Sequence, residues 1–187
     1  MILHDRKLIL NNGKSCYMRS GEAEDSRKLA LYFRQAVQED EPQELLVGEV
    51  PDVYQTRRIL QQFAEEERRI LLLAWMHRQI VGFGVLYPAS PYAHKRHRGQ
   101  VAVSVLPGHR RIGIGTMLVQ QLMHCAAKWE YEQIELELRR HIPVKTTFRN
   151  WKLFVLPFHA VFIHMLIWIT LLTLSSVCMK EDMTSAV

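Results

Sequence analysis

Cysteine is scarce in this sequence, and neither sign of charge dominates it. Its 187 residues include three cysteines, Cys16, Cys125 and Cys178, which are far apart and have no metal-ligand spacing. This usage argues against a disulfide scaffold or a zinc site and is typical of a reduced, cytoplasmic protein. The net charge of +5, from 24 Lys and Arg against 19 Asp and Glu, suits an anionic ligand but is too small and dispersed to indicate nucleic acid.

Charged residues are missing from most of the C-terminal quarter. No acid occurs between Glu137 and Glu181, and residues 153–179 contain no Asp, Glu, Lys or Arg. The preceding part has the mixed charges of an ordinary globular domain and is long enough to bury a core. We therefore divide the chain into one domain over residues 1–140 and an atypical apolar tail over residues 141–187.

The N-terminus lacks the uncharged apolar core of a secretory signal. Asp5, Arg6 and Lys7 interrupt the segment where such a core would lie. Together with the cysteine usage, this predicts a cytoplasmic protein.

Hydrophobic periodicity over residues 1–140 predicts an alternation of strands and helices. Apolar positions spaced by three and four residues indicate helices, and apolar runs bounded by turn residues indicate strands. On these signals we expect helices over 24–39, 52–67 and 115–129, and strands over 15–20, 69–76, 79–87, 100–106 and 133–138. A turn and a helix separate the last two strands, which makes them a parallel pair. The fold class is thus α+β, with a mixed central sheet flanked by helices.

The most informative stretch is a glycine-rich turn that precedes the third predicted helix. It contains Arg110, Arg111, Gly113 and Gly115. The first turn of a helix presents unpaired backbone N–H groups, glycines let a ligand approach them, and arginines add charge-assisted bonds. These features favour a phosphate or pyrophosphate site. The alternative is a tight turn whose glycines only allow positive φ and whose arginines are solvated.

The motif Arg110-Arg111-Ile112-Gly113-Ile114-Gly115 resembles the acyl-coenzyme A loop of the GNAT-superfamily N-acetyltransferases, Arg/Gln-x-x-Gly-x-Gly/Ala. It lacks the Gly-Lys-Ser/Thr of a P-loop and the third glycine of Gly-x-Gly-x-x-Gly. The surrounding elements also look like that superfamily, because a strand and Pro107 precede the loop, a helix follows it, and a central hairpin lies upstream. The resemblance covers residues 15–138 and implies a GNAT-like mixed sheet.

The resemblance implies acetyl-CoA as a cosubstrate and assigns the residues that bind it. Backbone groups of Val103 and Val105 would bond the pantetheine arm, and the amides from Arg111 to Thr116 would hold the pyrophosphate. The acetyl group would then lie where the two parallel strands separate. The cofactor-binding set implied in this way is Val103, Ser104, Val105, Arg110, Arg111, Ile112, Gly113, Ile114, Gly115 and Thr116.

Three functions remain open from the sequence. The first is an N-acetyltransferase that transfers an acetyl group from acetyl-CoA to a primary amine of a small molecule or protein. The second is a non-catalytic or inactive coenzyme A-binding protein of the same fold. The third is a membrane-anchored interaction protein. Coenzyme A binding separates the first two from the third, and turnover separates the first from the second.

No catalytic residue is assigned, because the resemblance stops after Leu138. The family usually continues with an Asn, an Ala and a Tyr that often serves as general acid, whereas this chain has no tyrosine after Tyr131. The strand over 100–106 also carries no carboxylate that could act as a general base. The other titratable residues near these elements are interpreted as solvated, namely Glu135, Glu137, His94, His97 and His109.

One interpretation of the apolar tail is a membrane anchor. Residues 153–179 are long enough for a membrane-spanning helix. Lys145, Arg149 and Lys152 precede this stretch and would keep the domain on the cytoplasmic side.

Two other interpretations concern the sheet and the reading frame. The strand-prone residues 154–174 could supply the closing strands of the sheet. A change of reading frame after Leu138 would also produce the abrupt loss of acids and of the family pattern. Without closing strands the edge at 133–138 stays open, and we expect a poorly soluble or membrane-associated chain with little activity.

Overall fold

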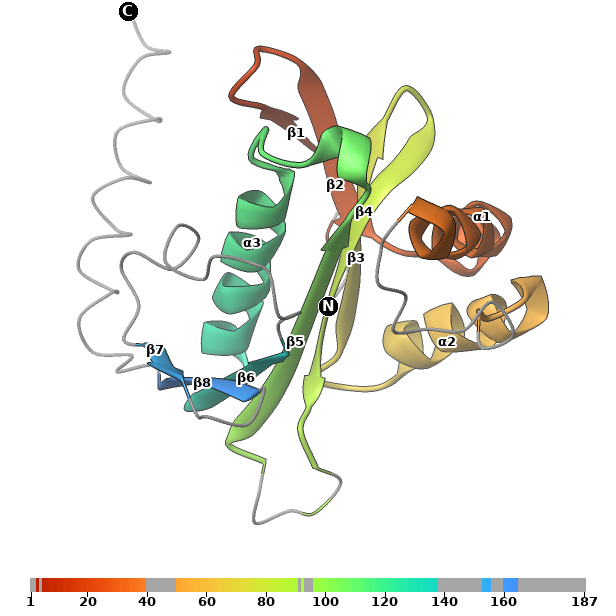
Figure 1. Cartoon of the computed structure of the whole chain (residues 1–187). Helices are drawn as coiled ribbons and strands as arrows, with labels where there is room; N and C mark the ends of the chain where they lie inside the picture. The colour runs from red at the N-terminus through yellow and green to blue at the C-terminus, as the bar shows by residue number, and fades with distance from the viewer. Residues whose placement is uncertain are drawn as a thin grey trace, which may run out of the picture.

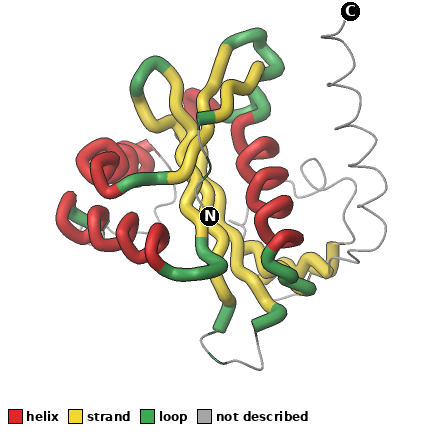
Figure 2. The backbone as a smooth tube through the Cα atoms, turned by 180° about the vertical axis from the view of Figure 1, so that it is seen from behind, coloured by secondary structure: helices red, strands yellow, loops and turns green. Residues whose placement is uncertain are grey.

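The computed structural model describes residues 3, 5–39, 50–90, 92, 96–137, 153–155 and 160–164 of the chain. Figure 1 shows its elements, and Figure 2 traces the backbone from behind. The strands are β1 (Arg6–Ile9), β2 (Ser15–Ser20), β3 (Ile70–Met76), β4 (Gln79–Pro88), β5 (Arg98–Val105), β6 (Gln133–Glu137), β7 (Leu153–Val155) and β8 (Ala160–His164). The helices are α1 (Ser26–Glu39), α2 (Val53–Glu65) and α3 (Ile114–Lys128), and short 3-10 turns lie at Ala23–Asp25 and Pro107–His109.

The described strands form one mixed sheet in the order β1-β2-β3-β4-β5-β6-β8-β7. Neighbouring strands are antiparallel except β5 and β6, which run parallel and are connected through α3. Helix α3 covers one face of the sheet, and α1 and α2 lie beside each other over the opposite face (Figure 1). The α+β class, the mixed sheet and the parallel pair are therefore confirmed.

Each face of the sheet has its own hydrophobic core, and β3 contributes to both. Ile70 and Leu72 pack on the side of α3, whereas Leu71 and Leu73 pack on the side of α1 and α2. An uninterrupted apolar run of this kind is typical of a central strand that is covered on both faces. Burying one such side chain contributes about 1.5–3 kcal/mol, so this strand anchors the domain.

Helix α2 begins where the sequence predicts a helix, with Asp52 as its N-cap. The Asp52 carboxylate accepts a hydrogen bond from Gln55 N at 2.7 Å, and Gln55 Oε1 accepts one from Asp52 N at 3.0 Å. This reciprocal capping box satisfies two backbone donors at the start of the helix. The helix ends at Glu65, before the predicted residue 67, because Glu66 already has an extended backbone with ψ of 139°.

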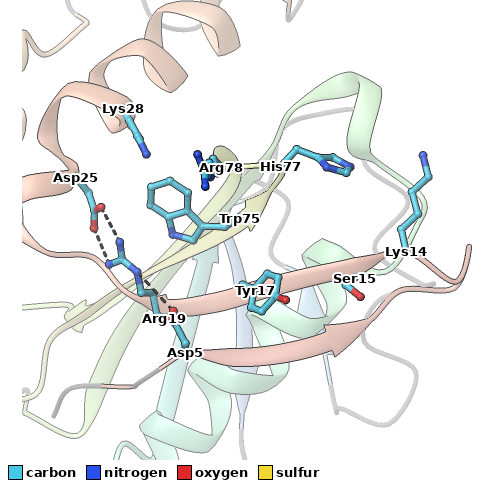
Figure 3. Close-up of a pocket in the computed structure, with 10 residues that line it drawn as sticks. All are labelled: Asp5, Lys14, Ser15, Tyr17, Arg19, Asp25, Lys28, Trp75, His77 and Arg78. Carbon is cyan, nitrogen blue, oxygen red and sulfur yellow. Dashed lines mark hydrogen bonds and ion pairs between the residues drawn. The ribbon is translucent and has the colours of Figure 1, made fainter.

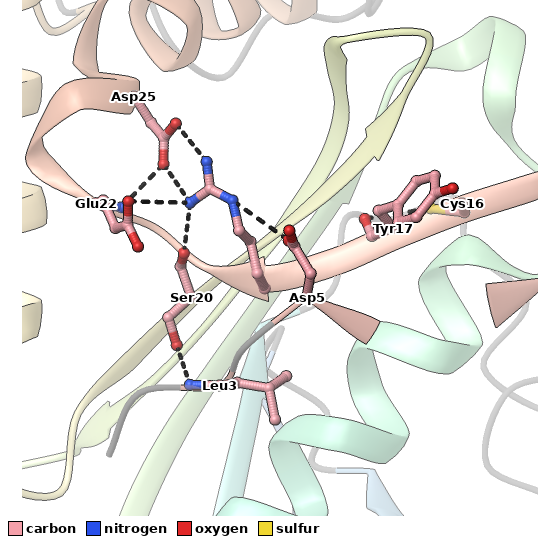
Figure 4. Close-up of polar contacts among 8 residues, drawn as sticks. Leu3, Asp5, Cys16, Tyr17, Ser20, Glu22 and Asp25 are labelled. Carbon is pink, nitrogen blue, oxygen red and sulfur yellow. Dashed lines mark hydrogen bonds and ion pairs between the residues drawn. The ribbon is translucent and has the colours of Figure 1, made fainter. Parts of the chain in front are cut away.

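Strand β1 was not predicted from the sequence, and Arg19 of β2 ties it to the domain. Figure 4 shows Asp5, Ser20 and Asp25, the partners of this arginine, around the same point. The Arg19 guanidinium donates to both carboxylate oxygens of Asp25 at 2.7 Å and to the Ser20 carbonyl oxygen at 2.9 Å. Its Nε lies 3.6 Å from Oδ1 of Asp5, which directly precedes β1. Hydrogen bonding to Asp25 is the main cause that raises the pKa of Arg19. The strand Arg6–Ile9 is short and mostly exposed, so no alternation of buried residues marks it in the sequence.

Strand β5 begins at Arg98, two residues before the predicted start of this strand at residue 100. The Arg98 side chain forms an ion pair with Glu135 of the neighbouring strand β6, and both side chains are half-buried. The prediction that Glu135 is a solvated residue is therefore wrong, because the arginine neutralises its charge within the sheet.

Two short strands of the tail join the sheet. Strand β8 pairs antiparallel with β6, and β7 pairs with β8, which is the arrangement that the closing-strand interpretation predicts. The remaining tail residues, 138–152, 156–159 and 165–187, lie outside the described residues. The division into domain and tail and the three interpretations of the tail therefore stay predictions. Within the described ranges, none of the helices combines the length and the apolar composition that crossing a membrane requires.

Candidate active site

The candidate site is built on the C-terminal half of β5, which has a partner strand on one side only. Strand β4 pairs with β5 from Gly99 to Val105, whereas β6 pairs with it only from Arg98 to Val101. From residue 102 to residue 105, the edge of β5 that faces β6 pairs with no residue in the described part of the chain. Among the described residues, β5 therefore has an unpaired edge from residue 102 to residue 105, which is called the free edge below.

Hydrogen bonds at the two ends of β5 show which backbone groups face this free edge. Leu106 N donates to Val81 O at 3.0 Å, and Arg98 O accepts from the residue that follows β4, also at 3.0 Å. Backbone groups of alternate residues in a strand point to the same side. The N–H and C=O groups of the even-numbered residues from Arg98 to Leu106 therefore face β4. Val103 and Val105 therefore direct their N–H and C=O groups to the free edge.

The loop after β5 presents the N-terminus of α3 beside that edge. Its backbone turns through positive φ at Arg111 (64°) and at Gly113 (102°), and Gly113 is the N-cap of α3. The N-cap has no side chain that could accept from the helix, and Met117 N already bonds Gly113 O at 3.1 Å. The amides of residues 114–116 thus have no acceptor within the helix and lie at the positive end of its macrodipole. This is the geometry of an anion site.

Two features hold the loop and α3 in place. From the β1–β2 turn, Asn11 N donates to Ile112 O at 3.2 Å. On β4, a Cβ at Gly84 would lie 2.9 Å from Leu122 Cδ1, a distance that real Cβ atoms essentially never show. Glycine at this position therefore allows α3 to approach the sheet, and the approach places the helix N-terminus next to the end of β5.

The two arginines of the loop are exposed and differ in their contacts. Arg110 Nε donates to Val105 O at 2.8 Å, so this side chain occupies one of the acceptors on the free edge. Arg111 has a left-handed backbone, a strained conformation for a non-glycine residue that is enriched at ligand sites.

The predicted cofactor-binding residues lie on β5, in the loop that follows it and in the first turn of α3, but Ser104 differs from its neighbours. The side chains of Val103 and Val105 pack on the α3 side of the sheet. Ser104 points to the opposite face, where its Oγ accepts a hydrogen bond from the Tyr32 hydroxyl of α1 at 2.9 Å. Tyr32 was not predicted as a site residue, because the apolar periodicity of its helix carries no information about a polar contact with the sheet. No sequence signal indicates a contact across 72 positions.

The titratable residues considered from the sequence do not gather at the free edge. Glu135 is paired with Arg98, His97 is exposed at the start of β5, and His109 is half-buried in the loop. His94 and the side chain of Glu137 lie outside the described residues. No general base is assigned among these groups.

A separate shallow cavity of about 700 Å³ lies over β2 and β3 beside α1 (Figure 3). The Trp75 ring contacts two cations there, with the Arg19 guanidinium carbon 5.0 Å and Lys28 Nζ 4.9 Å from its centroid. None of the predicted cofactor-binding residues lines this cavity. It is therefore distinct from the site on β5.

The sequence matches the model of the acetyltransferase (GNAT) family over residues 32–142. The chain belongs to this family. The matched residues include β3 to β6 and the loop before α3, and so the whole candidate site. No curated protein matches the sequence.

Solved structures of GNAT proteins share the fold of the chain. A GNAT-family acetyltransferase from Streptococcus pneumoniae has a TM-score of 0.66 at 17% identity, and the match covers 79% of this chain and 96% of the Streptococcus chain. The ribosomal-protein-alanine N-acetyltransferase from Brucella melitensis has a TM-score of 0.65 at 17% identity, covering 79% and 98%. The PaiA N-acetyltransferase from Thermoplasma acidophilum, solved in complex with coenzyme A, has a TM-score of 0.63 at 14% identity, covering 80% and 98%. At these identities the likeness shows a GNAT-like fold.

Proposed function

We propose that the chain is an acetyl-CoA-dependent N-acetyltransferase that acts on a primary amine of a small molecule or a protein. The observation that carries the proposal is the free edge of β5 lying next to the unpaired amides at the start of α3. An extended pantetheine arm carries amide groups that can pair with Val103 and Val105 as an added strand would. A pyrophosphate at the other end of the arm fits the helix N-terminus, where Arg110 and Arg111 add positive charge.

The fit of coenzyme A to these residues rests on the chemistry of the groups present. The free edge supplies both donors and acceptors, as an amide-containing arm requires. The start of α3 supplies backbone donors, and Arg110 and Arg111 supply positive charge, as a pyrophosphate requires. The same family includes structures with bound acetyl-CoA and coenzyme A, such as an acetyltransferase from Salmonella typhimurium and the Thermoplasma protein. These matches support acetyl-CoA as the cosubstrate of this chain.

In the proposed reaction, the chain binds and orients the thioester for direct attack by the amine. The neutral amine nitrogen attacks the carbonyl carbon, and a backbone N–H on the free edge stabilises the negative charge that develops on the carbonyl oxygen. The C–S bond then breaks, and its electron pair leaves with the sulfur. The nitrogen loses its extra proton to solvent, since no side-chain base is assigned.

The test is an assay of the full chain with acetyl-CoA and a panel of small amines and peptide N-termini, following release of the free thiol. We expect amine-dependent release at a rate on the order of 1 per second with the right acceptor, as is common for enzymes. Binding of coenzyme A without turnover on any amine would favour the non-catalytic alternative. That alternative is supported by the absence of a carboxylate on β5. Failure to bind coenzyme A would contradict both functions.

A further inference from the structure

A side-chain hydrogen bond connects α1 to the free edge of β5. The Tyr32 hydroxyl donates to Ser104 Oγ at 2.9 Å. Tyr32 is 3% exposed, and its ring makes edge-to-face contacts with Phe33 and Phe83 at centroid distances of 6.0 Å and 5.5 Å. The ring is therefore fixed by packing, and its hydroxyl holds the Ser104 side chain in one orientation.

Ser104 occupies a particular position on that edge. It lies between Val103 and Val105, whose backbone groups point to the free edge. Along the free edge, from residue 102 to residue 105, it has the only polar side chain. Its hydroxyl is half-buried on the face opposite α3, and Tyr32 is its one hydrogen-bond partner among the described residues.

The hydroxyl pair can present one further donor at the site, since each hydroxyl both donates and accepts. When Tyr32 donates to the Ser104 oxygen, the Ser104 proton is available to another acceptor. A hydroxyl that accepts one hydrogen bond becomes a stronger donor in another, since the two bonds polarise each other. Cleavage of a thioester places negative charge on the sulfur, and a fixed donor next to that charge lowers the barrier.

We propose that Ser104, positioned by Tyr32, donates a hydrogen bond to the coenzyme A sulfur as the thiolate leaves. This inference rests on the proposed function. The C–S bond breaks with its electron pair on sulfur, the Ser104 O–H stays intact while it donates, and the thiolate later takes a proton from water. Ser104 is the catalytic residue in this step, and Tyr32 is a positioning residue that acts through it.

The first experiment measures the bound thiol directly and does not depend on turnover. Coenzyme A is bound to the full chain, and its thiolate is titrated by ultraviolet absorbance. A hydrogen bond to the thiolate favours the charged form, so the bound thiol should have a pKa about one unit below that of free coenzyme A. Ser104→Ala should reverse this shift, Tyr32→Phe should reverse part of it, and Ser104→Thr should keep it, because threonine retains the hydroxyl.

The second experiment separates kcat from KM with acetyl-CoA and an accepted amine. Losing a donor to a developing charge costs on the order of 100-fold in kcat. We therefore expect Ser104→Ala to lower kcat by about that factor with KM for acetyl-CoA unchanged, and Tyr32→Phe to lower it less. Tyr32→Phe keeps the ring contacts, and Tyr54→Phe on the exposed side of α2 is the matched control that should change neither parameter.

The outcomes distinguish this inference from the proposed function. A bound thiol pKa that is the same in the wild type and in Ser104→Ala overturns the role of Ser104, even if the chain turns over. A shifted thiol pKa that depends on Ser104 in a chain without turnover supports the hydrogen bond and contradicts the proposed activity. A loss confined to KM indicates a purely structural role and overturns the inference, and failure to bind coenzyme A overturns both.

Discussion

At the scale of single residues, the two glycines at the start of α3 have different roles. Gly113 has a φ of 102°, which an L residue with a side chain rarely adopts. Gly115 lies in the first turn of α3, where an added Cβ would meet only Val105 Cγ2, at an ordinary 3.7 Å. A substitution at Gly113 therefore changes the folding of the loop, whereas one at Gly115 changes the space available to a ligand.

Gly113→Ala should destabilise the domain by about 1–2 kcal/mol, because alanine must adopt a left-handed conformation at this position. Gly108→Ala is the matched control in the same loop, since a Cβ at Gly108 has no atom within 4 Å and no positive φ is required there. Its effect should stay within about 0.5 kcal/mol, as for most surface substitutions. Urea unfolding of the two variants provides the measurement. Equal stabilities would show that the backbone at Gly113 is not strained.

Two buried thiols should make the stability of the domain fall at high pH. Burial is the main cause that raises the pKa of Cys16 and of Cys125 above the ordinary value of 9.0. Above about pH 9 the unfolded chain therefore releases thiol protons that the folded chain retains, so the free energy of unfolding decreases with rising pH. Urea unfolding at pH 8 and pH 10 should show a smaller decrease in a Cys16→Ala, Cys125→Ala variant than in the wild type. The same decrease in both proteins would mean that other groups cause it.

At the scale of elements, the unit of β5, the loop and α3 was the part most accessible from sequence. Its strand, glycine pair and amphipathic helix are local patterns, and the parallel pairing of β6 follows from the length of the connection. Strand β1 and the contact between Tyr32 and Ser104 were not accessible. The first is a short exposed edge strand, and the second joins residues far apart in the chain. Neither produces a periodic signal.

The same unit predicts how ligand affinity depends on salt. Positive charge at Arg110, Arg111 and the start of α3 attracts the phosphates of coenzyme A, so its affinity should weaken as ionic strength rises. Pantetheine without phosphates should bind poorly at any salt concentration, because it reaches only the free edge of β5. Calorimetric titrations of both ligands at low and high salt test this. Equal affinities for pantetheine and coenzyme A would contradict the assignment of the loop.

At the scale of the whole molecule, the sheet separates two chemical environments. On one side α3 covers the strands and presents its N-terminus to an anion. On the other side α1 and α2 cover them, and Tyr32 reaches Ser104 from that side. The free edge of β5 lies in the plane of the sheet, between these two sides. Acetyl-CoA bound along the free edge would thus have its phosphates at the N-terminus of α3 and its sulfur near Ser104.

The most direct test of this account is calorimetric titration of coenzyme A into the wild type, Gly115→Ala and Gly115→Glu. The account predicts that the alanine variant binds, since alanine suits the first turn of a helix and meets no close atom. The glutamate variant should lose detectable binding while its thermal unfolding stays close to that of the wild type, because its carboxylate would occupy the anion site and repel the pyrophosphate. An unchanged affinity in a folded Gly115→Glu variant would contradict the assignment of the loop and of the function proposed from it.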